Sequence, residues 1–90
     1  MYKRTVLIQN RTGLHARPAT EFINCASKFN SKITIRSLSE EDEVDAKSIM
    51  LLLSLAIGQG DEVEISARGD DETEAVDALV ALIESKFDED

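Results

Sequence analysis

Alternation between strand-type and helix-type segments is the feature that most constrains how this 90-residue chain folds. Residues 32–37, KITIRS, and 61–69, DEVEISARG, place apolar residues at every second position, which predicts strands buried on one face. Residues 18–29 and 70–87 space apolar residues three and four apart, which predicts helices with one buried face. A chain of this length has room for one core. We therefore expect a single domain, 1–90, in which helices pack on one side of an antiparallel sheet whose other side meets water.

The remaining segments complete the order β-α-β-β-α-β-α. Residues 4–9, RTVLIQ, predict a first strand, and residues 43–46, EVDA, predict a weak partner for the strand at 32–37. A short helix is expected after Ser48, which suits an N-cap, with Gly58 and Gly60 at its end. In the last helix, the expected apolar stripe consists of Val76, Leu79, Leu82, Ile83 and Phe87.

Charge and cysteine content exclude several classes of function. The formal net charge of −8 disfavours nucleic acid or an anionic membrane as the main partner. No signal-peptide pattern opens the chain and no apolar run approaches a membrane span, so we expect a soluble cytoplasmic protein. Cys25 is the only cysteine, so no intramolecular disulfide forms, and we expect a small, partly buried apolar residue there. One cysteine and one histidine cannot build an ordinary zinc site, and nothing indicates another metal or a cofactor.

The segment NRTGLHARPAT, residues 10–20, holds the only histidine and the only proline. Pro18 predicts the first turn of a helix, which places His15 at or near the N-cap. Free backbone N–H groups and the helix dipole favour an anion there and help to keep the imidazole neutral. Arg17 adds a guanidinium that can hold phosphate oxygens, so the group suits a ring that carries a phosphoryl group. From spacing alone, a structural or merely exposed histidine is the commoner case, and acid–base catalysis would lack a second catalytic group.

This segment resembles the active-site signature of the HPr family, the histidine-containing phosphocarriers of the sugar phosphotransferase system. The segments AKSIM…SL and GDEVEISARGDDETEA are similar to the same family, so the resemblance covers essentially the whole chain. It implies an open-faced β-sandwich of the α+β class, with a four-stranded antiparallel sheet and three helices. It also implies that His15 accepts phosphate on Nδ1 from phosphorylated enzyme I and passes it to enzyme IIA domains of sugar permeases. Arg17 would steady the phosphate, and Ala16 and Pro18 would form the helix start around it. Such a chain is a stoichiometric carrier and not an enzyme.

The resemblance also assigns roles to the segment around Ser48. Five apolar residues in a row, Ile49 to Leu53, exceed what a short helix can bury on one face. The family pattern places Ile49, Met50 and Leu53, with Lys47, in a partner-docking surface and puts Leu52 and Leu55 inside; ordinary core packing is the alternative. In some relatives the serine is phosphorylated by HPr kinase/phosphorylase, and the product binds a catabolite control repressor. Ser48 is thus expected to cap the helix and to be a regulatory phosphorylation site.

Three departures from the family pattern concern partners. Leu51 stands where relatives commonly have glycine, the turn at 38–43 is longer and more acidic, and Asn24 and Ser27 replace frequent lysines. Weaker electrostatic steering lowers an association rate more than it changes the chemistry. The alternative reading is therefore a paralogue that acts mainly as a regulatory binding module through phosphorylated Ser48. We expect a monomer in either case.

Overall fold

A computed structural model describes residues 1–88 and shows four strands in one antiparallel sheet. The strands are β1 (Tyr2–Leu7), β2 (Lys32–Ser37), β3 (Glu43–Asp45) and β4 (Glu62–Arg68), in the spatial order β1-β4-β2-β3. The helices are α1 (Ala16–Ala26), α2 (Ile49–Ser54) and α3 (Glu72–Glu84), followed by the single turn η1 (Lys86–Asp88). The predicted fold class, an open-faced β-sandwich with three helices, is confirmed.

Alternation along the strands decides which face of the sheet is buried. Ile35 lies opposite Ile65, and Val63 lies opposite Val6; all four are buried beneath the helices. Their neighbours along the strands point to the uncovered face, where Arg36 of β2 reaches Glu64 of β4 at 3.4 Å. The period of two read from the sequence therefore sets the side of the sheet that the helices cover.

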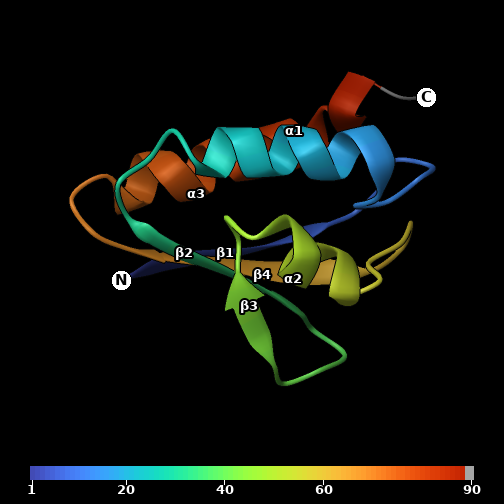
Figure 1. Cartoon of the computed structure of the whole chain (residues 1–90), viewed down its shortest axis with the longest axis horizontal. Helices are drawn as coiled ribbons and strands as arrows, with labels where there is room; N and C mark the ends of the chain where they lie inside the picture. The colour runs from blue at the N-terminus through green and yellow to red at the C-terminus, as the bar shows by residue number, and fades with distance from the viewer. Residues whose placement is uncertain (89–90) are drawn as a thin grey trace.

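The helices form the second layer. Figure 1 shows α1 and α3 running along the same face of the sheet, with α2 beside them near β3. Helix α1 buries Pro18, Ala19, Phe22 and Ala26, and it contacts both α2 and α3. Phe22 is fully buried, and the buried residues of α3 are Ala75, Val76, Leu79, Val80 and Ile83. Among residues 1–88, no helix has the length and apolar character that crossing a bilayer requires.

Asp71 fixes the beginning of α3 against the loop before β2. Its carboxylate accepts backbone N–H bonds from Asn30 at 2.8 Å and from Ser31 at 2.9 Å, and a bond from the Ser31 hydroxyl. The Ser31 hydroxyl, followed by the Asn30 N–H, holds the pKa of Asp71 below its usual value. Asp71 thus ties the beginning of α3 to the loop that leads into β2.

Some boundaries predicted from the sequence are wrong by a few residues. The first strand spans 2–7 and not 4–9, because its ladder is set by pairing with β4 from Tyr2 to Leu7. Helix α2 ends at Ser54 and not at Gly58 and Gly60, because Ala56 adopts a left-handed conformation at φ 52°. Phe87 is buried as expected, but it lies beyond α3, in a turn that departs from helical geometry at φ 52°.

Candidate functional site

The loop before α1 is pinned at several points, and this fixes the direction in which His15 leaves the core. The Asn10 side-chain amide donates to the Gly13 carbonyl at 2.9 Å. The Leu14 N–H donates to the Ile57 carbonyl at 3.0 Å, and the Leu14 side chain is fully buried. The loop that follows α2 therefore supports the loop that precedes α1.

His15 is the N-cap residue of α1, as the sequence predicts. Its backbone is extended, at φ −130° and ψ 163°, and its side chain makes no capping hydrogen bond. The imidazole is half-buried, so it stays accessible at the helix N-terminus. Ala16 follows in a left-handed conformation at φ 52°, an uncommon and strained backbone for alanine. A ring beside a helix N-terminus that makes no capping hydrogen bond is suited to carry an anionic group.

Arg17 lies in the first turn of α1 with its side chain largely exposed. One guanidinium nitrogen donates to the Phe87 carbonyl at 3.4 Å, and Nε lies 3.9 Å from a carboxylate oxygen of Glu21. Pro18 is buried and anchors the same turn. Ala16, Arg17 and Pro18 thus follow His15 in the first turn of α1, and the Arg17 side chain is engaged on the side of the C-terminal turn.

Ser48 precedes α2 as its N-cap, and its hydroxyl accepts the Leu51 N–H at 3.3 Å, so the predicted N-cap is confirmed. Met50 is 80% exposed, and the other large apolar side chains that reach solvent from α2 are Ile49, Leu51 and Leu53. Leu52 is fully buried and Leu55 half-buried. We call the four exposed residues, 49–51 and 53, the α2 patch. Neighbouring exposed apolar side chains of this kind are typical of interaction sites.

Lys47 is expected from the sequence to belong to the docking surface, but its ammonium group is engaged in a hydrogen bond within the chain. Its ammonium group donates to the Phe29 carbonyl at 2.7 Å, just beyond the C-terminal end of α1. This bond ties the segment before α2 to the turn that follows α1. Three features of this region escaped the sequence analysis: the bond from Lys47, the contact of Arg17 with Phe87, and the pairing of Arg17 with Glu21. Only the last had a signal in the sequence, the i,i+4 spacing on a helix.

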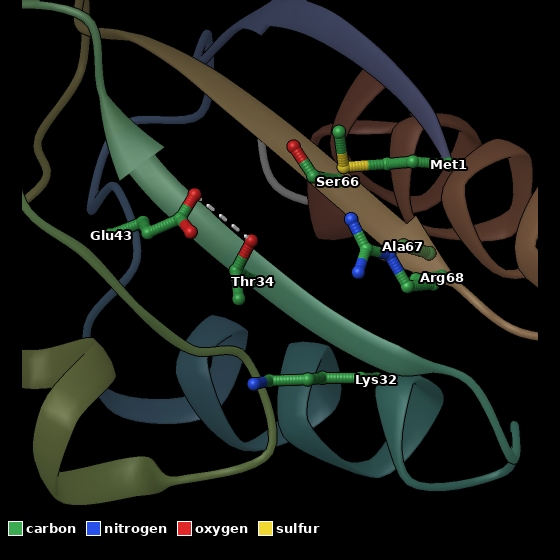
Figure 2. Close-up of a pocket in the computed structure, with 7 residues that line it drawn as sticks. All are labelled: Met1, Lys32, Thr34, Glu43, Ser66, Ala67 and Arg68. Carbon is green, nitrogen blue, oxygen red and sulfur yellow. Dashed lines mark hydrogen bonds between the residues drawn. The ribbon is translucent and has the colours of Figure 1, made fainter.

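A separate hollow of about 250 Å³ lies on the face of the sheet that the helices leave uncovered. Figure 2 shows its lining, which includes Lys32 and Thr34 of β2 and Arg68 of β4, with the Thr34 hydroxyl bonded to Glu43 at 3.3 Å. None of its lining residues belongs to α1 or α2. The hollow is therefore distinct from the region around His15.

Cys25 lies in a groove between α1 and α3 and is half-buried, as the sequence predicts. Burial raises the pKa of its thiol, which disfavours the nucleophilic thiolate. Among residues 1–88, no group of three or more histidine, cysteine or acidic side chains is arranged to hold a metal ion.

Comparison with known proteins agrees with this arrangement. A family model described as "PTS HPr component phosphorylation site" matches residues 2–85. Phosphocarrier protein NPr of Proteus mirabilis (strain HI4320) is 46% identical over 87 residues, covering 97% of this chain and 96% of the relative. HPr-like protein Crh of Halalkalibacterium halodurans is 44% identical over 86 residues, covering 96% of this chain and 100% of the relative.

A solved structure of HPr from Thermoanaerobacter tengcongensis superposes with a TM-score of 0.94 at 53% identity, covering 100% of this chain and 99% of that one. Family model, sequence relatives and structure thus agree over nearly the whole length. Together with the histidine at the start of α1, they establish that this chain belongs to the HPr family of phosphocarriers of the phosphotransferase system.

Proposed function

We propose that this chain accepts a phosphoryl group on His15 from phosphorylated enzyme I and passes it to enzyme IIA domains of sugar permeases. The observation that carries the proposal is the position of His15: an accessible imidazole at the N-cap of α1, with no hydrogen bond holding its side chain in a capping role. Arg17, in the first turn, supplies the positive charge that a phosphoryl group requires. His15 is the acceptor and Arg17 the stabilising cation.

The transfer needs little covalent chemistry from the protein. The bond between phosphorus and enzyme I breaks as a bond forms between phosphorus and the unprotonated Nδ1 of His15. The helix N-terminus favours the negative charge that arrives with the phosphoryl group. Because the phosphorus–nitrogen bond is labile, the next acceptor can remove the group. The chain therefore works as a stoichiometric carrier with no turnover of its own.

A direct experiment is incubation with enzyme I and phosphoenolpyruvate, followed by measurement of intact mass. The expected result is the gain of one phosphate that is lost on mild acid treatment, as a phosphohistidine requires. Absence of labelling, with a properly folded chain and an enzyme I that labels a known HPr, would overturn the proposal.

A second role, regulation through Ser48, is favoured by the position of this serine at the start of α2. Its hydroxyl is half-exposed and borders the α2 patch. Similar chains include a phosphocarrier protein, NPr, and Crh of Bacillus subtilis, which is named a catabolite repression HPr. In the alternative function, HPr kinase/phosphorylase would phosphorylate Ser48, and the product would bind a catabolite control repressor. Labelling of His15 by enzyme I separates the two functions.

Replacement of Ser48 by aspartate is expected to slow labelling of His15 at least several-fold with little loss of stability. Aspartate keeps the N-cap, and the helix dipole tolerates an anion there, so the free energy of unfolding should change by less than about 1 kcal/mol. The added charge lies beside the α2 patch and repels an acidic partner. Initial labelling rates and thermal melts of both proteins measure the effect. Ser48→Asn is the matched control, since it keeps a cap without a charge; equal rates for aspartate and wild type would leave Ser48 as a cap only.

Substitution of Met50 by glutamate tests the α2 patch. Met50 is 80% exposed, so the change should cost little stability, whereas a charge in an apolar contact surface should weaken docking. We expect a higher KM for this chain in the enzyme I reaction and an unchanged melting temperature. Thr73→Glu adds the same charge at an exposed position in α3 and should leave KM unchanged. A normal KM for Met50→Glu would remove Met50 from the docking surface.

The proposed partners are enzyme I and enzyme IIA domains in the cytoplasm, met through Ile49, Met50 and Leu53. Lys47 contributes positive charge at the border of this surface while its ammonium group donates to the Phe29 carbonyl, beyond the end of α1. We propose that the chain acts as a monomer, which is supported by a core that one copy closes by itself.

A further inference from the structure

Glu21 carries a carboxylate oxygen whose environment is unusual for a helix surface. Its Oε2 is shielded from solvent, and no hydrogen-bond donor among residues 1–88 reaches it. The rest of the side chain is partly exposed, at 37%. The charged neighbour of this oxygen is Arg17, one turn earlier on α1, whose Nε lies 3.9 Å away. That distance allows Coulomb attraction but is too long for a hydrogen bond.

The second contact of Arg17 is also long. Its guanidinium donates to the Phe87 carbonyl at 3.4 Å, near the upper limit for such a bond. Both contacts draw the side chain toward Glu21 and the C-terminal turn, and neither involves His15. In Figure 1, η1, the turn coloured red beyond α3, lies near the N-terminal end of α1, where His15 is the N-cap. Arg17 therefore lies in the helix turn next to the proposed phosphorylation site, but its side chain is engaged by two weak contacts, with Phe87 and with Glu21.

We propose that Glu21 is a positioning residue that holds Arg17 off the phosphoryl site and so tunes how tightly His15 keeps its phosphate. This inference rests on the proposed phosphorylation of His15. When the phosphoryl group arrives, Arg17 must exchange the Glu21 carboxylate for the phosphate oxygens. The exchange leaves a shielded carboxylate oxygen without its cation, which is costlier than exposing a hydrated one.

The consequence is a bias toward passing the phosphate on. A carrier that binds its group too tightly would stop the relay, whereas one that must give up the pairing of Arg17 with Glu21 on loading gains less from the group. Glu21 therefore raises the free energy of the loaded state relative to the empty state. An exposed i,i+4 ion pair is weak, so the effect is a modest shift of an equilibrium and not an on–off switch.

The experiment measures the equilibrium ratio of phosphorylated to unphosphorylated chain. Full-length protein is incubated with enzyme I at fixed concentrations of phosphoenolpyruvate and pyruvate, and the ratio is read from intact mass. Glu21→Gln removes the charge and keeps the shape, and it should raise the ratio by roughly two- to five-fold. Glu74→Gln, at an exposed position in the first turn of α3, is the matched control and should leave the ratio unchanged. A ratio for Glu21→Gln that is equal to or below wild type would overturn the inference.

A double-mutant cycle tests whether Glu21 acts through Arg17. In an Arg17→Ala background, Glu21→Gln should shift the ratio by less than half as much as in the wild-type background. A shift of the same size in both backgrounds would mean that Glu21 acts by long-range charge, which would overturn its role as a positioning residue. Thermal melts check that every variant is folded. The proposed function fails separately, because it fails when wild type itself takes up no phosphate.

Discussion

Replacement of His15 by alanine is expected to abolish the transfer of phosphate from enzyme I while leaving the fold intact. The imidazole is half-buried and makes no capping hydrogen bond, so its loss removes little packing. We expect the free energy of unfolding to change by no more than about 0.5 kcal/mol, the usual range for a surface substitution. Labelling should fall to background, because no second imidazole exists in the chain.

Intact mass after incubation with enzyme I and phosphoenolpyruvate measures the first outcome, and a thermal melt measures the second. His15→Gln provides a polar control that should also take up no phosphate. An acid-labile phosphate retained by the alanine variant would place the acceptor elsewhere. A lost cooperative melt would show that the ring serves the fold.

The largest effect on stability is expected for Gly13→Ala, in the loop that presents His15. Gly13 has φ +66°, and a Cβ atom there would lie 2.5 Å from the Ile57 carbonyl oxygen and 2.6 Å from Cα of Gly58. Both atoms belong to backbone, so they cannot turn aside as a flexible side chain would. The left-handed conformation costs alanine about 1–2 kcal/mol, and displacement of the two loops raises the expected total to about 2–4 kcal/mol. For a chain of this length, that corresponds to a fall in Tm of roughly 10–25 °C.

Gly60→Ala is the control that separates strain from contact. Gly60 also has a positive φ, +93°, but a Cβ there would meet nothing within 4 Å. It should lose stability through backbone strain alone and therefore clearly less than Gly13→Ala. Equal melting temperatures for the two variants would mean that the loops before α1 and after α2 separate without cost.

The local sequence pattern was sufficient to predict the buried face of the sheet and the helix beginnings at which His15 and Ser48 lie. Ile33 and Ile35 alternate with Thr34 and Arg36, and this period alone identifies the buried face of β2. Pro18 and Ser48 mark helix beginnings because proline and serine have strong positional preferences there. In the same way, the spacing in GLHARPA sufficed to put His15 at the N-cap.

Features that depend on contacts between distant segments left no local signal. Phe87 reaches the core through a turn in which Lys86, Phe87 and Asp88 have positive φ. None of the three is glycine, so the sequence did not indicate this turn. The early end of α2 likewise uses Ala56 in a left-handed conformation. The engagement of Arg17 with the Phe87 carbonyl joins residues 70 positions apart, a pairing that only the packed chain defines.

The strand order has a consequence for when this chain acquires its shape during synthesis. Strand β4 lies between β1 and β2, so the first and second strands have no common partner until residues 62–68 have left the ribosome. Before that point only the β2–β3 hairpin can pair, and an isolated hairpin is marginal in water. The pairing of Tyr2 with Ala67 then closes a loop that spans most of the chain, which makes folding slow relative to a helical protein of equal size. A nascent chain therefore holds His15 on a segment without its supporting sheet until β4 has emerged.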